Sequence, residues 1–213
     1  MNTLLFQGDS ITDASRKRDL PDHLGGGYVN MAAGALNFRY PQKSLRILNR
    51  GVSGDRTKNL LGRWQADCLD LNPTWLSIYV GINNTWRKFD QDDPTPPEVF
   101  EAELSSLIAQ AIGGGVQAGN IVLLEPFLLD EPAGTKSEWF EDLEPKQNIV
   151  RKLSEVHGTR WIPLQALFND ALERAPAAWW APDGVHPTPA GHYLIAQAWL
   201  RTMEDLIGGG VHG

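Results

Sequence analysis

A serine near the start of the chain has surroundings that suit nucleophilic catalysis. Ser10 directly follows a short apolar run and lies in the segment Gly8-Asp9-Ser10-Ile11-Thr12. A serine at the end of a strand, beside a glycine that permits a tight backbone, is placed where a nucleophile is wanted. Serine at such a point is also a common helix N-cap, so the segment alone is compatible with either role.

A histidine near the other end of the chain could serve as the base. His186 follows Asp183 by three residues on a turn rich in proline and glycine. The carboxylate of Asp183 can accept a hydrogen bond from one imidazole nitrogen, which leaves the other nitrogen free to take a proton from Ser10. The same two residues could merely cap the following helix, so this pair alone does not decide between catalysis and structure.

Acyl transfer also needs hydrogen-bond donors for the oxyanion that forms at the carbonyl. Two further predicted strands end in segments that offer such donors. After the second strand, Gly51 or Gly54 can present a backbone N–H, and after the third strand Asn83 can offer its side-chain amide. Each segment alone is ordinary turn chemistry. Together they indicate an oxyanion-binding site, because the ends of neighbouring parallel strands lie at the same edge of a sheet.

The elements that must position these residues are predicted from the apolar patterning. Short apolar runs at residues 4–7, 45–49, 76–80, 121–124 and 161–163 alternate with amphipathic segments at 60–71, 99–112, 140–157 and 190–207. Thr95 is expected to cap the second of these helices, with Pro96 at its first position. This alternation predicts one α/β domain over residues 1–213 with a flavodoxin-like, five-stranded parallel sheet and helices on both faces. Residues 208–213 are expected to form a frayed tail.

Composition excludes several other classes of protein. A net charge of -7 and an isoelectric point near 5.2 disfavour nucleic acid as a partner, and the basic run Arg16-Lys17-Arg18 fits a solvated turn. No apolar stretch approaches the ~18 residues of a membrane span, and no signal peptide is apparent, so a soluble, cytoplasmic protein is expected. No metal-binding motif occurs, so neither metal nor other cofactor is predicted. Cys68 is expected to be buried filler.

Taken together, the four segments resemble the four sequence blocks of the GDSL, or SGNH, hydrolases. They occur in the family's order and span the whole chain. The resemblance implies a nucleophile, a base that an aspartate orients, and an oxyanion hole formed by two backbone N–H groups and one asparagine. The residues it assigns to these roles are Ser10, His186 and Asp183 for the catalytic triad, and Ser10, Gly54 and Asn83 for the oxyanion hole. One departure concerns Asn84, where the family usually has aspartate.

Within that family, the chain is most similar to bacterial carbohydrate acetylesterases, typified by acetyl xylan esterases. The similarity rests on the segment 81–90, on Gly27-Tyr28-Val29, on Glu125-Pro126 and on Ala190-Gly191-His192. It implies a serine esterase that removes O-acetyl groups from xylo-oligosaccharides or other sugars. Aromatic faces suit sugar rings. The candidate substrate contacts are Asp9, Trp86, Trp179 and Trp180.

Two alternatives to a sugar acetylesterase stay open at this level. The same triad could serve a lipase, lysophospholipase or thioesterase. A chain rich in tryptophan, with 8 of them, could also be a non-catalytic carbohydrate-binding protein on the same scaffold. Exposed aromatic residues are compatible with a homo-oligomer.

Overall fold

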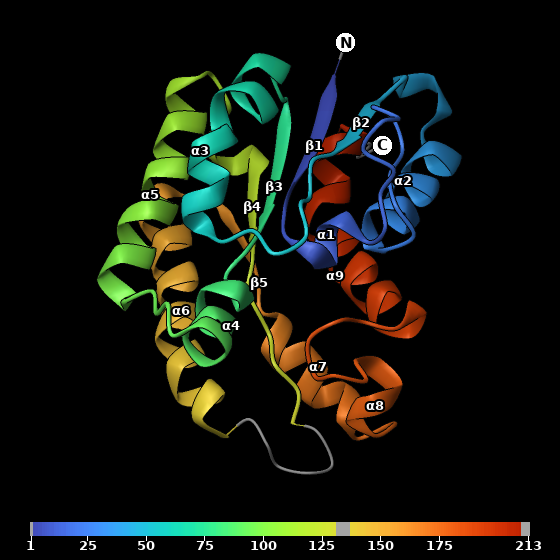
Figure 1. Cartoon of the computed structure of the whole chain (residues 1–213). Helices are drawn as coiled ribbons and strands as arrows, with labels where there is room; N and C mark the ends of the chain where they lie inside the picture. Colours follow the sequence, from blue (N-terminus) through green and yellow to red (C-terminus); the bar gives the residue numbers. More distant parts are fainter. Residues whose placement is uncertain (1, 131–136, 210–213) are drawn as a thin grey trace.

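The computed structural model describes residues 2–130 and 137–209, and its centre is a five-stranded parallel sheet (Figure 1). The strands stand in the order β2-β1-β3-β4-β5. Their bounds are β1 Thr3–Gly8, β2 Arg46–Asn49, β3 Trp75–Tyr79, β4 Ile121–Leu124 and β5 Arg160–Ile162. Each lies within one residue of an apolar run in the sequence, because strands that are covered on both faces are apolar throughout. The predicted fold class is therefore confirmed.

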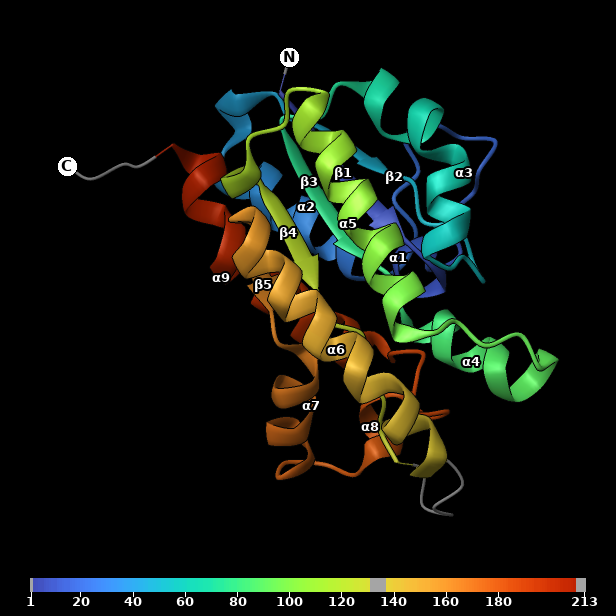
Figure 2. The same cartoon turned by 90° about the vertical axis from the view of Figure 1, so that its left-hand side faces the viewer.

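Helices cover both faces of this sheet. Their bounds are α1 Ser10–Asp13, α2 Tyr28–Arg39, α3 Thr57–Asp67, α4 Ile82–Gln91, α5 Pro97–Gly113, α6 Ser137–His157, α7 Leu164–Leu172, α8 Ala177–Trp180 and α9 Pro189–Gly208. Helices α3, α5 and α6 form one layer, in which α5 lies between the other two (Figure 2). Helices α2, α7 and α9 pack on the opposite face (Figure 1). Among the described residues, no helix combines the length and apolar character that crossing a membrane requires.

The strands feed two separate cores because alternate side chains of a strand point to opposite faces. Leu4 and Phe6 of β1 pack with α2 and α9, whereas Leu5 between them packs with α3 and α5. On β3, Tyr79 belongs to the first core and Ile78 to the second. The sheet is thereby held rigidly from both sides, and its carboxyl edge is a stable base for a site.

Three local expectations need correction. Residues 82–86 form the start of α4 and not a turn, since the chain leaves β3 at Gly81 and coils directly. Helix α5 begins at Pro97 with Pro96 as its N-cap, because the Thr95 hydroxyl instead accepts a hydrogen bond from Asn84 Nδ2 at 3.3 Å. Gly208 is the buried last residue of α9 and so is not part of a tail. Residues 210–213 lie outside the described part of the chain.

The sheet topology places the ends of the first three strands side by side. Strand β1 lies between β2 and β3, and all three run in the same direction. The segments that follow them carry Ser10, Gly54 and Asn83 respectively. In Figure 1 these segments lie at the lower edge of the sheet, where α1 and α4 begin.

Candidate active site

Ser10, His186 and Asp183 meet in the arrangement that nucleophilic catalysis requires. Ser10 Oγ lies 2.9 Å from His186 Nε2, although 176 positions separate the two residues in the chain. His186 Nδ1 lies 2.6 Å from Asp183 Oδ2. A proton on Nδ1 is donated to the carboxylate, which leaves Nε2 to accept the serine hydroxyl. The geometry therefore allows the imidazole to take a proton from Ser10.

Asp183 is well suited to orient the histidine because its own position is fixed by the turn. Its Oδ1 accepts the backbone N–H groups of Val185 at 2.9 Å and His186 at 2.7 Å. Partial burial would raise the pKa of Asp183, but the hydrogen bonds from the His186 ring and from these two N–H groups outweigh burial and lower it. The carboxylate consequently stays ionised at any pH near neutrality.

The three hydrogen-bond donors predicted for the oxyanion hole lie on the segments that follow β1, β2 and β3. Within the described part of the chain, the backbone N–H groups of Ser10 and Gly54 donate to no other residue. Gly54 adopts φ +87°, a conformation that favours glycine. Asn83 is 3% exposed, and its Nδ2 donates one hydrogen to the carbonyl of Asp55 at 3.2 Å. An amide nitrogen carries two hydrogens, so Asn83 keeps a second donor for an oxyanion.

Asn84 stands where the family usually has aspartate, and the structure shows how asparagine fits there. Its Oδ1 accepts the backbone N–H of Thr57 at 3.3 Å. Its Nδ2 donates to the hydroxyls of Thr57 at 2.9 Å and Thr95 at 3.3 Å. The amide thus acts as both donor and acceptor, and it holds the start of α4 against α3.

The expectation that Asp9 contacts substrate has to be corrected. Its side chain is fully buried, and its Oδ1 accepts the backbone N–H of Ile11 at 3.1 Å, which makes it the N-cap of α1. Its Oδ2 contacts no donor within the described residues. Burial raises the pKa of Asp9 from 3.8 to about 7. Asp9 therefore supports the turn that presents Ser10 and has no surface for a ligand.

We expect Asp9→Asn to change how stability depends on pH. Between about pH 4 and 7 the folded carboxyl keeps a proton that the unfolded chain releases, so the wild type loses stability as pH rises through this window. Asparagine does not titrate. Urea unfolding should show the wild type losing about 2–3 kcal/mol relative to the variant between pH 5 and 8. A difference between the wild type and Asp9→Asn that stays constant with pH would contradict the burial argument.

A cleft of about 570 Å³ opens beside the triad. It is lined by the polar residues Ser10, Asp13, Ser15, Arg16, Arg18, Ser53, His186 and His192, and by the apolar residues Ile11, Ala14 and Pro187. Arg18 pairs with Asp13 at 2.5 Å, and Arg16 donates to the carbonyl of Gly51 at 2.9 Å. These arginines were expected to lie on a solvated turn. Because Arg16 and Arg18 are close to Ser10 in the sequence, they could have been predicted to line the cleft.

His192 lines the same cleft but has a structural contact. Its Nδ1 accepts the backbone N–H of Tyr28 at 3.2 Å, and the two rings stack with centroids 6.5 Å apart. Burial lowers the pKa of His192 to about 4. The ring is therefore neutral near pH 7, and it joins α9 to the start of α2.

The three tryptophans expected at the cleft have different positions. The centroid of the Trp86 ring lies 5.8 Å from that of the His186 ring and 5.3 Å from that of the Trp139 ring. Trp179 is 62% exposed. The expectation that Trp180 contacts substrate has to be corrected. Trp180 is 6% exposed, and its Nε1 donates to the carbonyl of Ala175 at 3.1 Å. The short helix α8 turns these neighbours in different directions, so Trp180 packs inward.

Comparison with known proteins agrees with this geometry. A model of the GDSL-like lipase/acylhydrolase family matches residues 6–194. An acetylxylan esterase from Geobacillus stearothermophilus is 33% identical over 208 residues, which cover 94% of this chain and 93% of that protein. The Escherichia coli protein named thioesterase 1/protease 1/lysophospholipase L1 is 26% identical over 194 residues, covering 88% and 83% respectively.

Solved structures give the same picture. A variant of Axe2, an acetyl xylan esterase from Geobacillus stearothermophilus, matches with a TM-score of 0.86 and 33% identity over 95% of this chain and 94% of that chain. In three further Axe2 structures, described as catalytic mutants, alanine replaces a serine, an aspartate or a histidine. This chain belongs to the GDSL-like lipase/acylhydrolase family. It is a carboxylic ester hydrolase.

Proposed function

We propose that this esterase hydrolyses short acyl esters, chiefly O-acetyl groups on xylo-oligosaccharides, through an acyl-enzyme on Ser10. His186 Nε2 takes the proton of Ser10 Oγ as the oxygen attacks the acyl carbon. The backbone N–H groups of Ser10 and Gly54 and the amide of Asn83 stabilise the oxyanion. The sugar alcohol leaves with the proton from His186. Water then attacks the acetyl group on Ser10 in the same way and restores the free hydroxyl.

The polar lining of the cleft is the observation that carries the choice of substrate. Arg16, Arg18 and Ser53 offer hydrogen-bonding groups beside Ser10, and such groups suit the hydroxyls of a sugar. A long acyl chain in this place would have to lie against the guanidinium groups of Arg16 and Arg18, and covering such charged groups with apolar surface removes them from water at a cost. The aromatic ring of Trp86, whose centroid lies 5.8 Å from that of the His186 ring, adds an apolar face of the kind on which sugars stack.

Similarity to characterised enzymes supports the same choice. The relatives include an acetylxylan esterase at 33% identity over nearly the whole chain. They also include an enzyme named as thioesterase and lysophospholipase at 26% identity. The residues that line the cleft favour acetylesterase activity. The thioesterase and lysophospholipase activities are the alternative that an experiment has to distinguish from it.

Acyl-chain preference tests this proposal directly. Rates of acetate release from acetylated xylo-oligosaccharides should be compared with the hydrolysis of nitrophenyl esters from acetate to laurate and with a lysophospholipid. We expect the highest kcat/KM for acetyl esters and a fall of more than about a hundredfold at acyl chains of eight carbons, because the longer apolar chain would have to lie against the polar groups of the cleft. A preference for long acyl chains would refute the substrate while leaving the esterase class intact.

A further inference from the structure

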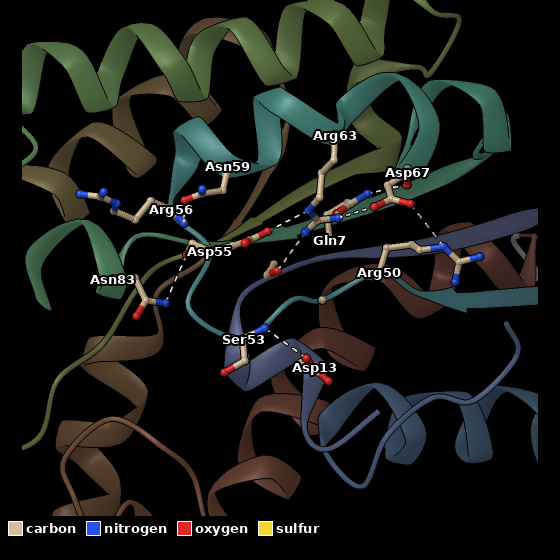
Figure 3. A network of polar contacts seen from close by, with 12 residues as sticks. Gln7, Asp13, Arg50, Ser53, Asp55, Arg56, Asn59, Arg63, Asp67 and Asn83 are labelled. Carbon is tan, nitrogen blue, oxygen red and sulfur yellow. Dashed lines mark hydrogen bonds and ion pairs between the residues drawn. The ribbon is translucent and has the colours of Figure 1, made fainter. Parts of the chain in front are cut away.

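Arg63 lies on α3 behind the active site and joins several elements through one guanidinium group (Figure 3). Its side chain is 18% exposed. Its Nε donates to Asp55 Oδ2 at 2.8 Å, and its Nη2 donates to the carbonyl of Gly8 at 3.3 Å. Its Nη1 donates to Gln7 Oε1 at 2.9 Å and pairs with Asp67 Oδ2 at 3.1 Å. The guanidinium is thus held on all sides.

Arg63 contacts the segments that carry two of the oxyanion donors, and one of those segments contacts the third donor. Gly8 ends β1 two residues before Ser10. Asp55 directly follows Gly54, and the carbonyl of Asp55 accepts the amide of Asn83 at 3.2 Å. Figure 3 shows Arg63 and Asn83 approaching Asp55 from opposite sides. One guanidinium group therefore joins the end of β1 to the segment after β2, and the carbonyl of Asp55 extends this connection to Asn83 at the start of α4.

The pair between Asp55 and Arg63 is shielded from water. Asp55 is 9% exposed. Burial raises the pKa of Asp55, and the hydrogen bond and charge of Arg63 oppose that rise. Removing one partner of a buried ion pair leaves an uncompensated charge and forces the other to move or neutralise. A change at Arg63 is consequently expected to shift the backbone of Asp55, and with it the carbonyl that orients Asn83.

We infer that Arg63 is a positioning residue for the oxyanion hole, acting through Asp55 on Asn83. The inference rests on the proposed oxyanion roles of Gly54 and Asn83. Oxyanion donors work only when they are held at the place where charge develops, and a displacement of about 1 Å can cost about a hundredfold in rate. Lysine cannot substitute here, because one ammonium group lacks the planar fork that reaches Asp55 and Gly8 together.

A double-mutant cycle with Arg63→Lys and Asn83→Ala tests this inference, using kcat and KM for nitrophenyl acetate. Asn83→Ala should lower kcat by about 10²–10³. Arg63→Lys should lower kcat by about ten- to a hundredfold with KM changed by less than about threefold, because the donors act on the transition state. In the Asn83→Ala background, the same lysine substitution should cost less than about threefold, since its target is then absent.

The matched control is Arg50→Lys. The Arg50 side chain is 15% exposed and pairs with the same Asp67 at 4.0 Å, but it does not contact Asp55. Its kcat should stay within about twofold of the wild type. Asp55→Asn provides a second variant if circular dichroism shows that Arg63→Lys does not fold. It removes the charge but keeps the carbonyl, and its loss should likewise vanish in the Asn83→Ala background.

Two outcomes would overturn the inference about Arg63. One is a double variant whose loss in kcat equals the product of the two single losses, which would mean that Arg63 acts independently of Asn83. The other is a kcat for Arg63→Lys within about twofold of the wild type. If Asn83→Ala itself retains nearly full activity, the oxyanion role of Asn83 fails first, and the inference about Arg63 fails with it.

Discussion

Replacing Ser10 by alanine should reduce turnover of acetyl esters by roughly 10³–10⁶ and leave substrate binding largely intact. The Oγ atom is the group that the geometry presents to the acyl carbon, with the His186 ring 2.9 Å away to accept its proton. Alanine keeps the backbone N–H at this position, so one oxyanion donor survives. Initial rates of acetate release, together with the Kd of a non-hydrolysable sugar ligand, measure the two effects separately.

The chain offers a matched control for this substitution. Ser105 on α5 donates to or accepts from His157 on α6, with Oγ and Nε2 3.0 Å apart, and so reproduces the serine–histidine contact away from the sheet edge. Ser105→Ala should leave turnover within about twofold of the wild type, because Ser105 is a half-buried residue of α5 that takes no part in the active site. Near-normal acetate release by Ser10→Ala would refute the nucleophile.

Replacing Asp183 by asparagine should lower kcat by roughly 10³–10⁴ with little change in KM. The size follows from the orienting aspartate of serine hydrolases in general, where an amide favours the wrong imidazole tautomer. In this chain the carboxylate accepts the Nδ1–H of His186 at 2.6 Å. Without that charge, Nδ1 can be left unprotonated, and Nε2 then carries the hydrogen and cannot accept one from Ser10. Steady-state kinetics on a short acetyl ester measure the loss.

Asparagine at this position keeps the contacts that hold the turn. Its side-chain oxygen can still accept the N–H groups of Val185 and His186, so the fold of the turn is preserved. Asp183→Ala removes these contacts as well and should therefore lower the melting temperature, whereas Asp183→Asn should not. A loss in kcat below about tenfold for Asp183→Asn would show that the imidazole is oriented by other groups.

Much of the fold follows from local patterns in the sequence. Strand β4 occupies the predicted residues 121–124, and the other strands differ by one residue at one or both ends, because a buried parallel strand is a short unbroken apolar run. Helix α2 is not predicted by such patterns. Its sequence contains Ala32, Ala33, Gly34 and Ala35, and small residues on every side blur the apolar stripe. Helix α4 escapes prediction because Asn83 and Asn84 are typical of turns.

Some residues of the candidate site can be predicted from the sequence and others cannot. Ser10, Asp183 and His186 are recognisable because each stands in a short segment with its own chemistry, and the structure brings them together. Trp180 and Asp9 could not be judged from sequence, because whether a side chain beside a catalytic residue faces the cleft or the core depends on a turn of a few residues. Arg63 has no local signal at all, since its partners at Gly8 and Asp55 are close to it only in the folded chain.

Covalent labelling tests the acyl-enzyme on Ser10 most directly. The chain is incubated with a short-chain organophosphonate ester, and intact mass followed by peptide mapping locates the adduct. We predict one adduct per chain, on Ser10, with parallel loss of acetate release, and no adduct on Ser10→Ala. An active chain that takes up no label, or one labelled at a different residue, would contradict the account.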